Sequence, residues 1–357
     1  MKLCIKKLTI MKFKKILPLL ILLVLVFGAF FLYRMYGLVF NDNTAFEENE
    51  VVLYIPTGSS FSQLQEQLRP LVKDLEAFTF VAKLKDYPAR IKPGKYILIN
   101  GMSCNELVNT LRSGNVPINV TFNNQETIAS LAGRIAAQIE ADSISLYNAM
   151  TSDSFLESQG LNANQALAIY IPNTYKLKWN TSADEFRNRM LLEYQKFWNP
   201  ERIVLAKKQG LSPEQVITLA SIVHKETVKA DERPRVAGVY LNRLNRNMPL
   251  QADPTVIFAL KKMRGDFNTV IRRVLLRDLE LNSPFNTYKF GGLPPGPIAM
   301  PDISAIDAVL NPEIHDYLFF VADTSNFGYH LFAETLGQHN RNKKQYHNWV
   351  NTQKILR

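Results

Sequence analysis

A long apolar run lies near the N-terminus, where residues 16–33 (ILPLLILLVLVFGAFFLY) contain no charge over eighteen positions. This is close to the length that a helix needs to cross the hydrocarbon core of a membrane. The pattern therefore predicts a transmembrane helix over 16–33. A cleaved signal peptide is the alternative. The apolar part of a signal peptide is usually shorter, and the following FFLYRMY lacks a small-x-small cleavage site.

Beyond this run, short apolar periods predict a small α+β module at residues 50–116. Residues 34–49 are polar and acidic without a sustained period, and we expect them to form a linker. Apolar residues then recur at the spacing of strands or helices, and Gly, Pro and Ser residues typical of turns separate these segments. The predicted elements are strands at 51–55 and 95–99 and helices at 61–72, 75–84 and 103–113.

The remaining residues, 117–357, predict a larger mixed α/β domain. Residues 116–122 alternate like a half-buried strand, and a helix is expected at 126–139. Two β-rich runs, 317–323 and 328–334, flank a turn and predict a hairpin. Further helices are expected at 183–208, 213–228, 235–246, 254–262 and 303–310 and from about 338 to the C-terminus. The overall fold class is α+β.

Composition and charge exclude several classes of protein. A hydrophobic content of 46% and a charged content of 21% are typical of a folded chain, not a disordered one. The formal net charge is +10, but residues 1–34 contribute seven basic residues and no acid, which leaves 10 − 7 = +3 for the rest. A nucleic-acid-binding protein is therefore not expected.

The same lysines predict topology. By the positive-inside rule, residues 1–15 lie in the cytosol and everything after the apolar helix lies outside the cytoplasm. An alternative start at Met11 would shorten the basic segment without changing this orientation. Cys4 and Cys104 would then lie on opposite sides of the membrane, so they cannot form a disulfide with each other.

One helix carries the clearest candidate for chemistry. Ser212, Pro213 and Gln215 form a capping-box start, which fixes the register of the helix that follows. At about 100° per residue, Glu226 falls on the apolar side between Ile222 and Leu219. A desolvated carboxyl has a raised pKa and suits a general acid. The alternative is a structural glutamate at the edge of the core, paired with an arginine, for which the candidates are Arg233, Arg235 and Arg243.

Three other segments have patterns that bear on a site. Asp253-Pro254 has the pattern of a helix N-cap followed by proline. The Gly- and Pro-rich residues 286–297 are typical of a loop that walls a cleft. Residues 170–175 (YIPNTY) are of a type found in carbohydrate sites, although surface tyrosines are common.

His224 and Glu226 are too few ligands to predict a metal, and no cofactor is expected.

Several long motifs, taken together, resemble the MltG (YceG-like) family of endolytic murein transglycosylases. The resemblance covers most of the part of the chain after the apolar helix, and it implies a small LysM-like module at 50–116 followed by a YceG-like catalytic domain at 117–357. The motifs are ASIVHKET (220–227), ERPRVAGVYLNRL (232–244), LQADPTVIFAL (250–260), NTYKFGGLPPGPIAMP (286–301) and YLFFVAD with the later histidines (317–340).

The resemblance implies a set of site residues. The second acid of the family's Ile-(Ile/Val)-Glu-Lys-Glu-Thr segment, its catalytic glutamate, falls on Glu226, whereas His224 stands where the family has its first acid. That departure makes His224 a candidate modulator of the site. The other implied cleft residues are Gln251, Asp253, Asn286, Thr287, Tyr288, His330, His339 and Asn340.

The implied reaction is cleavage of the β-1,4 bond between N-acetylmuramic acid and N-acetylglucosamine in peptidoglycan, with a 1,6-anhydro product. The expected location is the cytoplasmic (inner) membrane, as a single-pass protein with its catalytic domain outside the cytoplasm. The expected partners are peptidoglycan glycan strands, the membrane and peptidoglycan synthases of the penicillin-binding type. Two alternatives remain open, a muramidase-type hydrolase with a second carboxylate, from among Asp231, Glu232 and Asp253, and a non-catalytic peptidoglycan-binding anchor.

Overall fold

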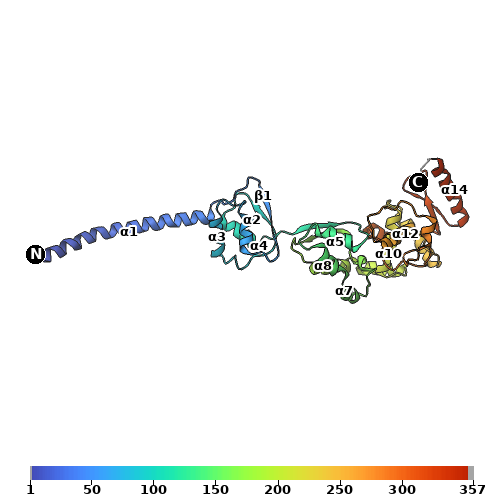
Figure 1. Cartoon of the computed structure of the whole chain (residues 1–357), viewed down its shortest axis with the longest axis horizontal. Coiled ribbons are helices and arrows are strands. Elements are labelled where there is room, and N and C mark those ends of the chain that lie inside the picture. The colour runs from blue at the N-terminus through green and yellow to red at the C-terminus, as the bar shows by residue number, and fades with distance from the viewer. Residues whose placement is uncertain (1, 353–357) are drawn as a thin grey trace. The chain divides into compact units, whose positions relative to one another are not determined.

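The computed structural model describes the backbone of residues 2–352 and the side chains of residues 17–350. The side chains of Cys4 and the N-terminal lysines, and the last residues of the predicted C-terminal helix (353–357), therefore lie outside the described part. The chain forms two compact units, one of residues up to 118 with 177–180 and one of residues 119–176 with 181–357. Figure 1 shows the elements of each unit.

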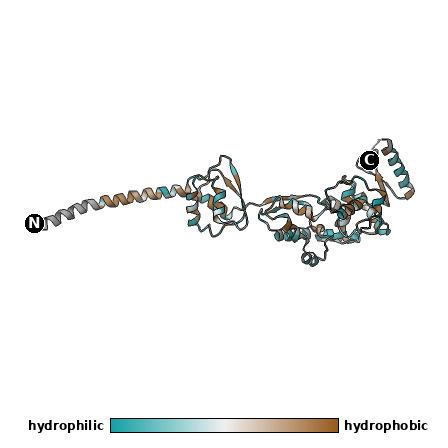
Figure 2. Cartoon of the chain, viewed as in Figure 1, coloured by the Kyte–Doolittle hydropathy of each residue, from teal (hydrophilic) through white to brown (hydrophobic). Residues whose placement is uncertain are grey.

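Helix α1 (Lys2–Phe40) contains the predicted apolar span. Its part Leu17–Phe40 has a mean hydropathy of 2.3 and is long and apolar enough to cross a membrane, by length and composition. Most of its side chains are exposed, and Figure 2 shows apolar residues along this part of the helix. A helix that is apolar without being buried in protein needs an apolar surrounding, and a membrane provides one.

The segment expected to be a linker is ordered in the structure. Helix α1 continues to Phe40, and Leu38 and Val39 pack against the core of the small module. Asn43 is 4% exposed, and its Nδ2 donates to the backbone carbonyl of Asp74 at 2.8 Å. Asn43 is thus a polar residue of this segment that is buried through a hydrogen bond to a residue remote in sequence. Local periodicity does not reveal such a bond.

The small module follows the predicted order. Strands β1 (Glu50–Ile55) and β2 (Gly94–Ile99) pair antiparallel, with Val52 opposite Ile97. Between and after them lie helices α2 (Phe61–Leu68), α3 (Leu75–Leu84) and α4 (Cys104–Ser113). Helix α2 ends at Leu68, before its predicted limit, and Pro70, which has no backbone N–H to donate to the helix, follows two residues later. The core includes Leu64, Phe78, Tyr96 and Leu107, each 0% exposed.

The first part of the second unit pairs strand β3 (Ile118–Phe122) with β4 (Asn173–Leu177). Tyr170 and Tyr175 are 1% and 8% exposed, so the interpretation of 170–175 as a carbohydrate surface is wrong. Both rings are used in packing, and Tyr170 stacks on Phe186. The surrounding helices are α5 (Ile128–Ala136), α6 (Ser143–Thr151), α7 (Asp153–Ser158), the 3-10 helix η1 (Ala166–Ile169) and α8 (Ala183–Phe197).

The helix predicted at 183–208 is two helices, α8 and α9 (Pro200–Lys208). The break lies at Asn199, whose side chain accepts from the backbone N–H of Arg202 and caps α9. Proline at the first helical position has no N–H to lose, so Asn199-Pro200 is a strong start signal. Apolar periodicity continues across the break and conceals it.

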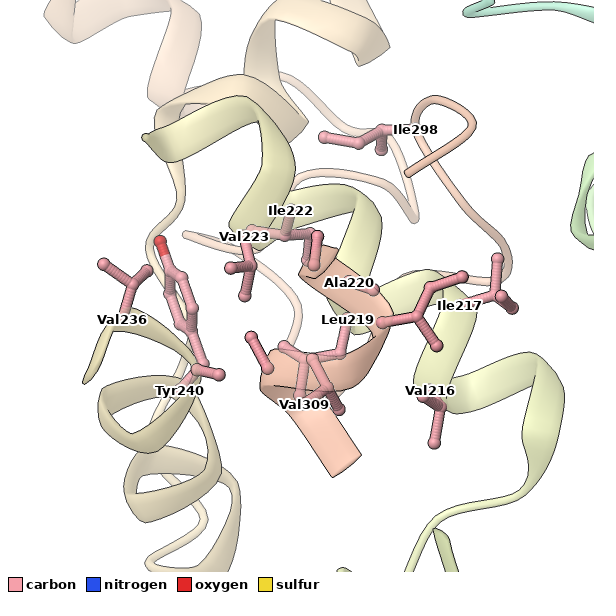
Figure 3. Close-up of a cluster of buried hydrophobic side chains, with 14 of the residues drawn as sticks. Val216, Ile217, Leu219, Ala220, Ile222, Val223, Val236, Tyr240, Ile298 and Val309 are labelled. Carbon is pink, nitrogen blue, oxygen red and sulfur yellow. The ribbon is translucent and has the colours of Figure 1, made fainter. Parts of the chain in front are cut away.

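The rest of the second unit carries the main core. Buried side chains of α10 (Pro213–Glu226) pack against Val236 and Tyr240 of α11 (Arg233–Asn245) and Val309 of α13 (Ile303–Leu310), as Figure 3 shows. Around this core lie α12 (Asp253–Arg264), the 3-10 helix η2 (Leu276–Glu280), β5 (Phe319–Ala322), β6 (His330–Ala333) and α14 (Leu336–Thr352). Strands β5 and β6 form the predicted antiparallel hairpin.

Candidate functional site

Glu226 is the last residue of α10. The helix begins with the predicted capping box, in which the Ser212 and Gln215 side chains each bond to the other residue's backbone N–H. Its buried face places Leu219, Ile222 and Val223 in the core at 0% exposure. The same face carries the Glu226 carboxyl to the edge of that core, where it is partly buried.

The partner of Glu226 is a tyrosine. Tyr240 of α11 is 2% exposed, and its Oη donates to Glu226 Oε1 at 2.6 Å. Figure 3 shows this ring among the buried side chains between α10 and α11. The Tyr240 ring also meets Phe320 of β5 edge to face, with centroids 5.9 Å apart. These contacts hold the hydroxyl in one place.

The alternative that an arginine pairs with Glu226 is not what the structure contains. Among the described side chains, Arg233 is paired with Asp302 and Arg235 with Glu313. Arg243 donates its Nε to the carbonyl of Leu318 at 2.6 Å and its Nη1 to that of Leu250 at 2.7 Å. Arg243 thus links α11 to Leu318, just before β5, and to the 249–251 segment.

Burial raises the pKa of Glu226 to about 7. The hydrogen bond from Tyr240 acts in the opposite direction, because it stabilises the carboxylate form. The negative charge of Asp253 raises this pKa further, and the positive charges of His330 and Arg243 lower it. The carboxyl therefore exchanges a proton near neutral pH, as acid–base catalysis requires.

Asp253 lies near Glu226, but it does not cap α12 as predicted. The N-cap is Ala252, no side-chain cap hydrogen bond forms, and Asp253 is the first helical residue. Its Oδ1 instead accepts from Tyr288 Oη at 2.6 Å. Burial and this bond to a carboxylate both raise the pKa of the Tyr288 hydroxyl, so it stays protonated and donates. The structure thus brings together Glu226, Asp253 and Tyr288.

Asn286 and Thr287 are buried, at 0% and 1% exposure, and they hold the loop in place. Asn286 Nδ2 donates to the carbonyls of Leu279 and Leu281 at 2.8 and 2.9 Å. Thr287 Oγ1 accepts from the backbone N–H of Ala252 at 3.0 Å. The backbone carbonyl of Thr287 accepts from the backbone N–H of Gln251. Both residues therefore position Tyr288 and Asp253 through the backbone and do not line an open surface.

Gln251 has an exposed side chain and a backbone φ of 50°. This left-handed conformation is unfavourable for a residue with a Cβ, and such strain concentrates at functional sites. Its N–H bond to the Thr287 carbonyl, at 3.0 Å, holds the conformation. The strained turn leads directly into Asp253 at the start of α12.

His330 lies close enough to Glu226 to affect its pKa, and the buried carboxylate of Glu232 holds it in place. His330 Nδ1 lies 2.8 Å from Glu232 Oε2, and its backbone N–H donates to Glu232 Oε1 at 2.7 Å. The Glu232 side chain is 2% exposed and that of His330 15%. Because Nδ1 is engaged, Nε2 is the ring nitrogen left for other partners.

Among the described side chains, the remaining predicted residues, His224, His339 and Asn340, form no hydrogen bond or ion pair with Glu226. His224 Nδ1 is 3.3 Å from Asp302 Oδ2, and burial lowers the pKa of its ring. Residues two apart on a helix point to nearly opposite sides, which separates His224 from Glu226. His339 stacks on Phe319 with centroids 5.1 Å apart, and burial lowers its pKa. Asn340 is exposed on α14.

Sequence reasoning missed Tyr240 and the bridging role of Arg243. Both lie in α11, whose apolar pattern predicts a core helix and gives no reason to select one hydroxyl. A tyrosine on the fully buried face of a helix is a usable signal, because a buried hydroxyl needs a partner. The nearest polar group on the facing helix is then the carboxyl of Glu226.

Comparisons with known proteins show what the whole chain is similar to. The chain is 30% identical over 315 residues to an endolytic murein transglycosylase of Bacillus subtilis (strain 168), covering 83% of this chain and 84% of that one. It is 30% identical over 330 residues to one of Streptococcus pneumoniae serotype 2, covering 84% of this chain and 58% of that longer protein. The crystal structure of a YceG-like protein from Listeria monocytogenes covers 83% of this chain and 99% of its own, at 28% identity and a TM-score of 0.55.

The family model described as the YceG-like family matches residues 53–345. That range includes the small module, Glu226 with its neighbours, and the C-terminal hairpin. The resemblance seen in the motifs is thereby confirmed, and the chain belongs to the YceG-like family.

Proposed function

We propose that the protein is a membrane-anchored endolytic lytic transglycosylase, which cleaves the β-1,4 bond between N-acetylmuramic acid and N-acetylglucosamine in nascent peptidoglycan and so ends strand elongation. The observation that supports it best is a partly buried carboxyl, Glu226, with a pKa raised to about 7 and one oxygen held by Tyr240. Relatives at 30% identity are named endolytic murein transglycosylases.

The chemistry needs one group that is first an acid and then a base. Protonated Glu226 would donate its proton to the glycosidic oxygen as that bond breaks. The resulting carboxylate would take the proton of the muramic 6-hydroxyl, whose oxygen attacks its own anomeric carbon and closes the 1,6-anhydro ring. Because Tyr240 engages Oε1, Oε2 is the oxygen that we assign to proton exchange.

The helix and the small module fit the rest of the proposal. Leu17–Phe40 has the length and composition of a single membrane span, and the basic residues before it would place the second unit outside the cytoplasm. The module has the order of strand, two helices and strand, and we propose that it is a LysM-like unit that holds glycan. Peptidoglycan synthases are the partners that we expect for an enzyme acting on nascent strands.

A muramidase is the second candidate, and one observation favours it. The Asp253 carboxylate is close enough to raise the pKa of Glu226, and a glycoside hydrolase uses two carboxyl groups. However, Asp253 accepts a 2.6 Å hydrogen bond from Tyr288, which makes it a weaker nucleophile or base. Glu232 is also engaged, by His330. We therefore favour intramolecular attack.

The test is digestion of peptidoglycan strands in ¹⁸O-water with the full chain in detergent. A transglycosylase leaves an unlabelled anhydromuramic end, about 18 Da lighter than a hydrolysed end, whereas a muramidase incorporates label. Glu226→Gln should lower the rate at least about a hundredfold, since acid–base catalysis contributes about 10²–10⁴-fold. Undiminished cleavage by Glu226→Gln would remove Glu226 from the mechanism. No cleavage by the unaltered chain would favour a non-catalytic anchor.

A further inference from the structure

The small module carries two adjoining hollows of about 510 and 400 Å³, both lined by Lys92, Arg112 and Ser113. Arg90 and Asn109 complete the first, and the second extends past Pro93 and Tyr96 to Lys178. We call the whole the basic pocket. It lies within the first unit and is distinct from the surroundings of Glu226.

Four basic residues, Arg90, Lys92, Arg112 and Lys178, line the basic pocket, and no acidic residue does. Asp86 lies at its edge and pairs with Arg90 at 3.1 Å, but both side chains are about two-thirds exposed, and such pairs contribute little. Among the described side chains, Lys92 and Arg112 form no ion pair. Lys92 and Arg112, which line both hollows, therefore contribute positive charge that no carboxylate of the lining balances.

The neighbouring Lys85 supports this description. Its Nζ donates to the amide oxygens of Asn105 and Asn109 at 2.5 and 2.6 Å. Both of these partners are neutral, so they do not balance the charge of Lys85. Burial and the positive charge of Arg112 both lower the pKa of Lys85. These cations thus repel one another, and a bound anion would relieve that repulsion.

The walls of the basic pocket are fixed before any ligand binds. Tyr96 Oη donates to the carbonyl of Lys92 at 2.8 Å, and Asn115 Nδ2 donates to that of Pro93 at 3.1 Å. The Tyr96 ring is fully buried. Arg112 itself projects from the last turn of α4, a helix whose start is fixed by the Ser103 capping box. Such preorganisation lowers the entropic cost of binding.

We propose that the basic pocket binds carboxylates of the short peptides attached to peptidoglycan strands, an inference that rests on the proposed function for its choice of polymer. The guanidinium of Arg112 is a planar fork that matches a carboxylate, and the Asn109 amide offers hydrogen bonds to a peptide backbone. Pro93 adds apolar surface, which suits a peptide better than a phosphate polymer. The module would then recognise the peptide-bearing state of the strand that the second unit cuts.

The test measures binding by the full-length chain in detergent, in a Glu226→Gln background that prevents cleavage. The Kd is determined for glycan strands that carry their peptides, for strands stripped by an amidase, which keep only the lactyl carboxylate of each muramic residue, and for poly(glycerol phosphate). The pocket variant is Lys92→Gln/Arg112→Gln. Its matched control is Arg69→Gln/Lys83→Gln, which removes the same charges from exposed positions of the same module outside the pocket.

We expect the pocket variant to bind peptide-bearing strands about tenfold more weakly, which corresponds to about 1.4 kcal/mol. Its Kd for stripped strands and the Kd values of the control should stay the same. Arg112→Lys keeps the charge without the fork and should lose only part of the affinity.

Equal affinity of the parent chain for both kinds of strand would overturn the proposal, as would an equal loss in the control. A loss confined to poly(glycerol phosphate) would overturn the assignment to peptides. Because binding is measured without cleavage, these outcomes are independent of the ¹⁸O experiment. Failure of the lytic reaction would leave a peptide-dependent Kd intact.

Discussion

Tyr240 Oη and Glu226 Oε1 are 2.6 Å apart and join α11 to the C-terminal end of α10. The tyrosine is buried, whereas the carboxyl is only partly so. The bond therefore ties the proposed acid to a fixed point in the core. It also opposes the effect of burial on the Glu226 pKa, so that this pKa lies near neutrality and not above it.

Removing that hydroxyl should shift the pH dependence of activity. In Tyr240→Phe the Glu226 carboxylate loses a donor worth about 1 kcal/mol, so its pKa should rise by about one unit from about 7. The general acid must be protonated, so the alkaline limb of the kcat/KM profile should move to higher pH. The matched control is Tyr194→Phe, which removes a 2.8 Å bond to Glu214 elsewhere in the second unit. An unshifted limb in Tyr240→Phe would contradict the assigned tuning.

Asp253→Asn should shift the same limb in the opposite direction. Its negative charge raises the pKa of Glu226, so its removal should lower that pKa and move the alkaline limb to lower pH. The anhydro product should persist, because in our proposal Asp253 is neither nucleophile nor base. Loss of all activity with the fold intact would instead support the two-carboxylate alternative.

Stability should depend on pH through Glu226. Its folded pKa of about 7 exceeds the ordinary value of 4.5, so the folded state holds this proton more tightly than the unfolded state. The group therefore costs nothing below about pH 4.5, and its cost grows as pH rises to about 7. Glu226→Gln should remove roughly 1–3 kcal/mol of this cost at pH 8 and little at pH 4. Urea denaturation at the two pH values measures it, and equal effects at both would exclude a raised pKa.

The Glu232 and His330 pair should support both the fold and the site. Glu232→Gln keeps an acceptor for the His330 backbone N–H but weakens the bond that holds the imidazole ring, and from this position His330 lowers the pKa of Glu226. We expect a loss of about 1–3 kcal/mol in unfolding free energy and an alkaline limb moved to higher pH. A control is Glu313→Gln, which breaks an exposed bond to Arg235 and should change neither. A stability loss without any shift of the limb would reduce the pair to a structural role.

In the loop that carries Tyr288, Gly296 should resist substitution because of its close neighbours. A Cβ at Gly296 would lie 2.0 Å from the backbone oxygen of Asn164, whereas one at Gly291 would meet nothing within 4 Å. Gly296→Ala should destabilise the protein by about 1–3 kcal/mol, and Gly291→Ala should be nearly neutral. Thermal unfolding compares the two, and equal melting temperatures would show that the 286–297 loop is not packed as described.

Much of the secondary structure was predictable because it is specified locally. The capping box at Ser212 and the apolar arc through Leu219 and Ile222 placed Glu226 on the correct side of α10. The antiparallel strand pair of the small module and the C-terminal hairpin likewise followed from β-rich runs next to turn residues. Where prediction failed, as at Asn199-Pro200, a local start signal interrupted a longer apolar period.

The sequence by itself determined the apolar anchor candidate, the register of Glu226 and, through its motifs, the family. Only the tertiary structure decided what surrounds that carboxyl. It brought Tyr240 and Arg243 from α11, Asp253 from α12 and His330 from β6 close enough to set one pKa. It also turned Asp253 from a helix cap into a partner of Tyr288, and buried Asn286 and Thr287 as supports. The physical reason is that electrostatic and hydrogen-bond effects depend on distances between elements remote in sequence, which no local pattern encodes.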